Sequence, residues 1–215
     1  MKRTLAFAAS LLLLGACSSD GYTIRGKIAG LDNPYVYLLR YTGEVEVIDS
    51  AKVTKGDFVF KGKAEQPEVV YLSTDKQQPF VHFFLENGRI SVDGALSAPA
   101  DIAVLGTPSN DIQRAFDEKI AREEEFAKAG NDVQRDSLRK EYSKLMSDAV
   151  EMNRDNIYGV TTFLNNAYAF LSPEEVMGQI ALFPAEWQQR RELTELREDT
   201  ERKLRVSAGH PYRDI

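Results

Sequence analysis

The sequence predicts an α+β protein in which an N-terminal antiparallel β-sandwich or barrel is followed by an all-α helical segment. From Tyr22 to about Gly106, short apolar runs are separated by turn residues, as expected for half-buried strands. After Pro108 the apolar residues recur every three or four positions, which is the period of amphipathic helices. About seven to nine short strands at this spacing are typical of a sandwich or barrel.

The strands of the β half are predicted from alternation and from turn residues. Ile24 and Ile28 alternate with Arg25 and Lys27, so one face of the first strand is apolar and the other is charged. Asn87-Gly88 separates two apolar runs and predicts a two-residue hairpin turn, because this pair tolerates the positive φ angles of such turns. The remaining strands are expected at residues 35–39, 58–60, 69–72, 81–85, 89–92 and 102–105.

The helices of the second half are predicted from apolar stripes and from helix-start signals. The most regular stripe lies in residues 160–171. Ser172-Pro173-Glu174-Glu175 predicts a helix start, with serine as the N-cap, proline at the first position and acids near the positive end of the helix dipole. A last helix is predicted from about Pro184 to Leu204, and its outer face carries acid-first pairs at i,i+4 spacing.

The N-terminus has the composition of a secretory signal peptide. Lys2 and Arg3 form a basic start, and an apolar run follows to Ala16 with only Ser10 interrupting it. The run is too short to span a bilayer as a helix, which needs about 20 apolar residues. We therefore expect residues 1–16 to be removed.

Leu14-Gly15-Ala16-Cys17 resembles the lipobox of bacterial lipoproteins. In that motif the cysteine thiol is lipidated and the bond before it is then cut. The resemblance implies that Cys17 is the lipidation site and that residues 17–21 form a short tether. The expected location is the cell envelope, as an outer-membrane lipoprotein facing the periplasm or the surface; Ser18-Ser19-Asp20 does not decide which. The alternative interpretation is an ordinary cleaved signal with an incidental cysteine.

Charge and cysteine content exclude several functions. The formal net charge is -6, and cleavage would remove the cations Lys2 and Arg3. This acidic balance argues against a nucleic-acid partner and against a surface that lies flat on anionic lipid. Cys17 is the only cysteine, so its lipidation would leave no disulfide, CxxC pair or thiolate metal cluster. His82 and His210 are the only histidines, and zinc needs three or four ligands, so neither a metal site nor a cofactor is predicted.

The remaining polar candidates do not predict an active site. Asp49-Ser50 precedes a predicted strand, but no base or oxyanion hole is marked for a serine nucleophile. Glu123-Glu124-Glu125 lies among arginines and lysines, as is typical of a solvated helix face. Most aromatic residues of the β half are expected in the core. Tyr35, Tyr37 and Tyr41 are the set that we predict to line a groove for a ligand or a partner strand.

Six segments of the β half occur in an order and spacing shared by a known family. They are Ile24-Arg25-Gly26-Lys27-Ile28, Tyr35-Val36-Tyr37-Leu38, Asp49-Ser50-Ala51-Lys52-Val53, residues 55–62, residues 84–90 and Leu105-Gly106-Thr107. With them, the chain resembles the domain-of-unknown-function 4369 family, found at the N-terminus of envelope lipoproteins of the Bacteroidetes. Together with the helical segment, the resemblance covers nearly the whole mature chain. It implies a β-sandwich domain over residues 22–107 and a helical domain over residues 108–206.

In many proteins of this kind a thioredoxin-like domain with a CxxC pair follows these two modules. Gly209-His210-Pro211-Tyr212-Arg213-Asp214-Ile215 is similar to the start of that domain, so we expect residues 207–215 to be its remnant. The resemblance therefore implies the non-catalytic front part of a thiol–disulfide oxidoreductase without its redox part. Dithiol chemistry would need cysteines that this chain does not have.

Three functions are compatible with these observations. The first is a lipid-anchored, non-enzymatic binding or docking module with an envelope protein as its partner. The second is an accessory role that presents substrates to a separate thioredoxin-like protein. The third is a hydrolase or carbohydrate-binding role that uses the acids and aromatic residues. The lipobox and the lack of a catalytic motif favour the first.

Overall fold

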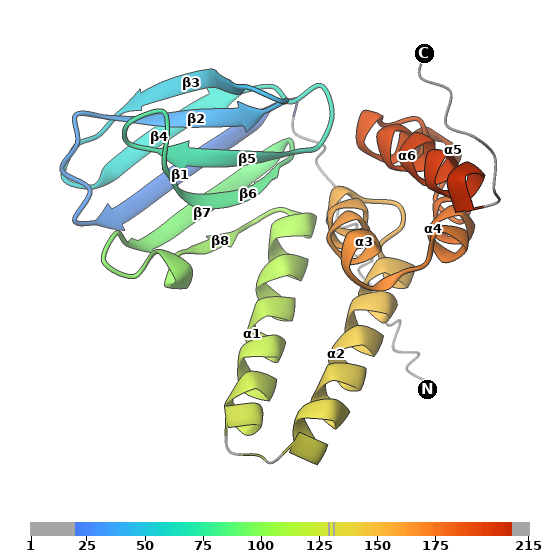
Figure 1. The fold of residues 1–215 in the computed structure, drawn as a ribbon. Coiled ribbons are helices and arrows are strands. Elements are labelled where there is room, and N and C mark those ends of the chain that lie inside the picture. Colours follow the sequence, from blue (N-terminus) through green and yellow to red (C-terminus); the bar gives the residue numbers. More distant parts are fainter. Residues whose placement is uncertain (1–19, 129, 131, 208–215) are drawn as a thin grey trace, which may run out of the picture.

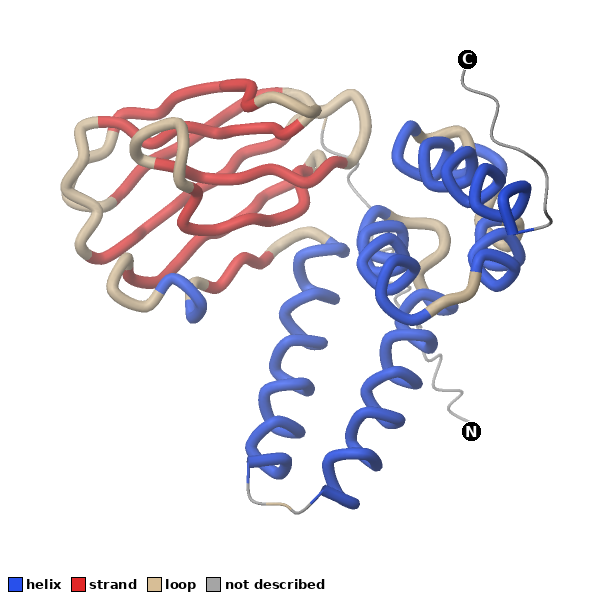
Figure 2. The backbone as a smooth tube through the Cα atoms, in the orientation of Figure 1, coloured by secondary structure: helices blue, strands red, loops and turns tan. Residues whose placement is uncertain are grey.

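A computed structural model describes residues 20–128, 130 and 132–207 of the chain. An N-terminal β-sandwich is followed by helices, so the predicted α+β class is confirmed (Figure 1). Strands and α-helices are segregated along the chain and in space (Figure 2). We call the two parts the β module and the helical module. None of the helices in the described part of the chain has the length and apolar character needed to cross a membrane.

The β module consists of two four-stranded sheets. One sheet has the strand order β4-β1-β7-β8 and the other has the order β3-β2-β5-β6. Between Ala95 and β8 the chain forms a short 3-10 helix, η1 (Pro99–Asp101). The strands are β1 (Tyr22–Ala29), β2 (Tyr35–Tyr41), β3 (Val45–Lys52), β4 (Asp57–Gly62), β5 (Glu68–Ser73), β6 (Pro79–Leu85), β7 (Gly88–Ala95) and β8 (Ala103–Leu105).

The two sheets enclose one apolar core, which follows from the alternation in the sequence. Ile24 and Ile28 are fully buried, whereas Arg25 and Lys27 are exposed, as the two-residue period predicts. Residues from both sheets complete this core: Val36, Leu38, Phe58, Phe60, Val70, Leu72, Phe83, Ile90 and Val92. Burial of such side chains contributes about 1.5–3 kcal/mol each, which is the main force that holds the sheets together.

Two details of the β module differ from the prediction. β1 and β7 pair in parallel, with Ile24 opposite Ile90, so the first sheet is mixed rather than purely antiparallel. The prediction of a hairpin at Asn87-Gly88 is wrong, because β6 and β7 lie in different sheets; Glu86 and Asn87 connect them, and Gly88 already belongs to β7. The Asn87 side chain instead accepts a hydrogen bond from the Ala64 amide and donates one to the Ala64 carbonyl, both at 2.9 Å.

The helical module begins with two long helices and continues with four shorter or oblique ones. The helices are α1 (Pro108–Lys128), α2 (Asp132–Met152), α3 (Ile157–Phe170), α4 (Pro173–Ile180), α5 (Ala185–Gln188) and α6 (Arg191–Ser207). The α1–α2 hairpin projects away from the sheets, whereas α3 to α6 gather beside one end of the sandwich (Figure 1). Val150 of α2 joins residues of α3 to α6 in one apolar core, which also contains Val160, Phe163, Val176, Ile180, Phe183, Leu193 and Leu196.

The helix boundaries confirm one predicted start and correct one predicted helix. Ser172 caps α4 through a full capping box with Glu175, as the Ser-Pro-Glu-Glu signal predicts. The helix expected from Pro184 to Leu204 is instead two helices, because the chain turns at Gln189 and Arg190. At this turn the Arg190 guanidinium lies over the Trp187 ring at 5.2 Å.

Buried contacts join the two modules. Phe84 of β6 packs in one cluster with Ile157 and Tyr158 of α3. The side chain of Asn110, in the first turn of α1, accepts a hydrogen bond from the Phe84 amide at 2.9 Å and donates one to the Phe84 carbonyl at 2.8 Å. Asn110 therefore provides hydrogen-bond partners for the backbone at the outer edge of β6, and the same contacts attach α1 to the sheet.

Candidate functional site: a groove between the modules

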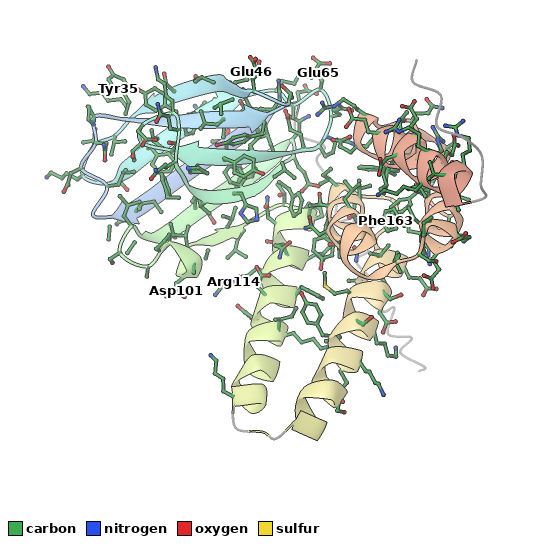
Figure 3. The ribbon with its side chains drawn as sticks, in the orientation of Figure 1. Tyr35, Glu46, Glu65, Asp101, Arg114 and Phe163 are labelled. Atoms are coloured by element: carbon green, nitrogen blue, oxygen red, sulfur yellow. The ribbon has the colours of Figure 1, made fainter. Side chains whose placement is uncertain are left out.

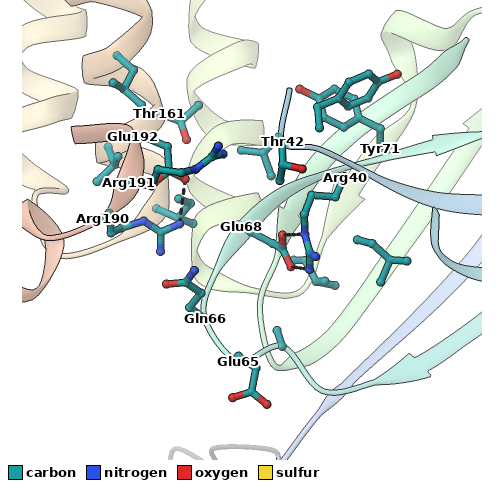
Figure 4. A pocket seen from close by; sticks show the side chains of 18 of the residues that line it. Arg40, Thr42, Glu65, Gln66, Glu68, Tyr71, Thr161, Arg190, Arg191 and Glu192 are labelled. Atoms are coloured by element: carbon teal, nitrogen blue, oxygen red, sulfur yellow. Dashed lines mark hydrogen bonds and ion pairs between the residues drawn. The ribbon is translucent and has the colours of Figure 1, made fainter. Parts of the chain in front are cut away.

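A cavity of about 530 Å³ lies where the end of the sandwich meets the helical module. Its walls come from the end of β2, the β4–β5 loop, the start of β5, the middle of α3 and the start of α6 (Figure 4). We call it the inter-module groove. Ligand sites are commonly found between domains, and this volume lies in the range of ligand pockets. The groove is therefore the candidate functional site.

An ion pair lies on the sandwich side of the groove. Arg40 of β2 donates from Nη2 to Oε1 of Glu68 at 2.7 Å and from Nε to the second oxygen of the same carboxylate. Its Nη1 donates to Glu46 at 3.1 Å. The hydrogen bond to Glu68 is the main cause that raises the pKa of Arg40, so its guanidinium stays charged. Because all three nitrogens are engaged, Arg40 forms a fixed part of the groove.

Two tyrosines line the same side. The rings of Tyr41 and Tyr71 meet edge to face, with centroids 4.6 Å apart. Tyr41 is 40% exposed, and its hydroxyl lies 3.4 Å from the carbonyl of Gln77 in the β5–β6 loop. An exposed aromatic ring that is already held by a neighbour offers contact area at little entropic cost.

The other side of the groove is the start of α6. The Arg190 side chain is only 8% exposed and donates from Nη2 to Glu192 at 3.3 Å. Its Nε is buried and has no hydrogen-bond partner among the residues that the structure describes. Arg191 is 56% exposed, and its carboxylate neighbour Glu195 is 3.8 Å away. Arg190, Arg191 and Glu192 lie together across the groove from Arg40 and Glu68 (Figure 4).

The structure separates the three tyrosines predicted to form one surface. Tyr41 lines the groove, but Tyr35, which is 47% exposed, lies at the opposite end of β2 (Figure 3). The two are six residues apart in an extended strand, or about 20 Å. Tyr37 lies between them, and its ring is covered by the Lys76 ammonium group at 4.6 Å.

The other residues considered from the sequence lie outside the groove. Asp49 and Ser50 lie within β3 rather than before a strand, and the Ser50 amide donates to the Asp49 carboxylate at 2.7 Å. His82 is exposed on β6 and lines a second cavity of about 410 Å³ between β6, β8 and α1. Cys17 and His210 lie outside the described residues, as do residues 1–16 of the predicted signal peptide and residues 208–215 of the predicted remnant.

Metal-ligand residues are scattered in the described part of the chain. No three histidine, cysteine, aspartate or glutamate residues come together there in a way that could hold a metal ion. Glu123-Glu124-Glu125 lies on α1, which projects away from the sheets (Figure 1).

Residues 22–113 match the model of a family described as a domain of unknown function (DUF4369). The match covers the β module and the first residues of α1, including Asn110. It confirms the resemblance predicted for the β half of the chain. No curated protein matches the chain.

Glu68→Gln is expected to lower the free energy of unfolding by about 1–2 kcal/mol. Breaking a fully buried ion pair costs about 3–5 kcal/mol, and the partial exposure of Arg40 (32%) and Glu68 (19%) reduces that cost. Urea denaturation of the variant measures the change. Glu65→Gln, on the exposed adjacent loop, is the matched control and should change stability by less than about 0.5 kcal/mol. Equal effects of the two substitutions would contradict a structural role for the pair.

Proposed function

We propose that this protein is a lipid-anchored cell-envelope protein whose inter-module groove binds an extended segment of a partner protein and catalyses no reaction. The observation that carries the proposal is the construction of the groove. The groove is built jointly by the two modules, and its arginines lie near carboxylates. Its accessible side chains are polar groups and one aromatic ring, which can bind the backbone and a side chain of a peptide. A thioredoxin-like protein acting in trans, which the family resemblance implies, is one candidate partner.

The lining of the groove fits a polypeptide chain. Gln66 and Asn165 are exposed, and Thr161 is partly exposed, so their side chains offer hydrogen-bond donors and acceptors to a peptide backbone. The Tyr41 ring provides an apolar contact for a side chain of the same segment. A pocket that combines an apolar contact with a few oriented polar groups is typical of ligand sites.

The predicted tether would keep the groove near the membrane. Tyr22, the first residue of β1, lines the groove. It lies five residues after Cys17, and a fully extended chain of that length spans at most about 18 Å. A lipid on Cys17 would therefore hold the junction of the two modules close to the bilayer, and partners attached to the same membrane would meet the groove at high effective concentration.

Tyr41→Ala is expected to weaken peptide binding about tenfold or more, because exposed aromatic anchors dominate binding energy. The probe is a displayed library of random 12-residue peptides, selected against the mature chain carrying Cys17→Ser. Fluorescence anisotropy of a selected synthetic peptide then gives the affinity for each variant.

Tyr35→Ala is the matched control, because Tyr35 lies on the same strand with similar exposure but away from the groove. Its affinity for the selected peptide should equal that of the parent. The proposal fails if no peptide is selected, or if the two substitutions weaken binding equally.

A further inference from the structure

We infer that the segment bound in the inter-module groove is acidic and that one of its carboxylates binds at the start of α6, between Arg190 and Arg191. The inference rests on the proposed function and adds the chemistry of the ligand. Three observations carry it: α6 starts with an arginine at its N-cap, the buried Nε–H of that arginine has no acceptor among the described residues, and a second guanidinium beside it is exposed.

The first observation concerns the end of the helix. The Arg190 carbonyl accepts the first helical hydrogen bond, from the Thr194 amide at 2.9 Å, so Arg190 occupies the N-cap position. An N-cap is normally Ser, Thr, Asp or Asn, whose oxygen accepts from the free amides of the first turn. Arginine has no acceptor, so the Arg190 side chain cannot cap the free amides at the start of α6. The start of α4 differs, because Ser172 accepts from the Glu175 amide.

The second observation is independent of the helix end. The Arg190 side chain is more than nine-tenths buried and lies over the Trp187 ring, and in the described part of the chain Glu192 is the one carboxylate it bonds, at the long distance of 3.3 Å. No acceptor within residues 20–128, 130 and 132–207 bonds the buried Nε–H of Arg190. An unsatisfied buried donor is unfavourable, and the penalty is larger when the group is charged. An incoming carboxylate can accept two parallel hydrogen bonds from a guanidinium and would relieve this deficit.

The third observation is the local charge. Arg191 is exposed, and the 3.8 Å that separates it from Glu195 exceeds a hydrogen-bond distance, so its guanidinium can turn to a ligand. Four cations and three carboxylates line the groove, although the whole chain has a formal net charge of -6. Glu68 is already committed to Arg40, which leaves the α6 side of the groove as the site where an added negative charge is best accommodated.

The test uses the peptides selected from the random library. They should be enriched in Asp and Glu or should require a free C-terminal carboxylate. Synthesis of each peptide as the free acid and as the C-terminal amide distinguishes a terminal carboxylate from a side-chain one. Arg191→Gln should weaken binding about tenfold, the value of one charge-assisted hydrogen-bonded contact.

Two further variants sharpen the test. Arg205→Gln, at an exposed position in the last turn of α6, is the matched control and should leave the affinity unchanged. Glu192→Gln removes the competing carboxylate and should strengthen binding, by about threefold. Peptides that depend on Tyr41 but show no acidic preference and no response to Arg191→Gln would overturn this inference while the proposed function stands. Selection of no peptide at all would overturn both.

Discussion

Cys17→Ser is expected to move the protein almost completely from the membrane pellet to the soluble fraction. A serine hydroxyl is not alkylated where a thiolate would be, so the variant should carry no lipid. Each buried methylene contributes about 0.8 kcal/mol to membrane binding, and one acyl chain binds only marginally, whereas two or more give stable anchoring. Loss of the anchor should therefore be nearly all-or-none. Fractionation followed by immunoblotting measures it.

Ser18→Ala is the control for this experiment, since it changes the neighbouring residue and leaves the thiol. It should stay in the membrane pellet. Mass spectrometry of the N-terminal peptide gives a second readout, because a diacyl or triacyl mass should be present in the parent and absent from Cys17→Ser. A Cys17→Ser protein that still sediments with membranes would exclude lipidation as the means of attachment.

Local sequence periodicity was sufficient to predict most elements of the β module. The alternation around Ile24 and Ile28 depends only on which face of one strand is buried, and a window of a few residues contains that information. The parallel pairing of β1 with β7 depends instead on which of two sheets each strand joins. Asn87-Gly88 illustrates the difference: the pair favours a tight turn, but the flanking strands bury their faces in different sheets, and that packing decides the path of the chain.

The groove could be predicted only in part, because its two sides come from distant parts of the sequence. Tyr41 belonged to the predicted aromatic surface, but Thr161 and Arg191, which face it across the groove, lie more than 100 positions later. The sequence predicted one continuous helix through Arg190, so the helix start at this residue was not predicted. A Gln-Gln-Arg-Arg run without an apolar residue, at positions 188–191, is the one local signal that a break was near.

Asn110→Ala is expected to have the largest effect on stability among the polar substitutions considered. The Asn110 side chain is 2% exposed and makes three hydrogen bonds, two to the Phe84 backbone and one to the Thr107 hydroxyl at 2.7 Å. Alanine would leave a buried amide and a buried carbonyl of β6 without partners, at a cost of about 1–3 kcal/mol each. The free energy of unfolding is expected to fall by about 2–4 kcal/mol, which lowers the melting temperature by roughly 10 °C in a domain of this size.

The same substitution should also weaken peptide binding in the groove, although Asn110 is not part of its lining. Asn110 holds the start of α1 against β6, and the groove exists only while the two modules keep their relative position. Asn33→Ala, at an exposed position in the loop between β1 and β2 and outside the groove, is the matched control and should change stability by less than about 0.5 kcal/mol. Thermal unfolding followed by circular dichroism, with peptide affinity measured well below the transition, separates the two effects. An Asn110→Ala protein that is destabilised but binds peptide with unchanged affinity would show that the groove does not depend on this attachment.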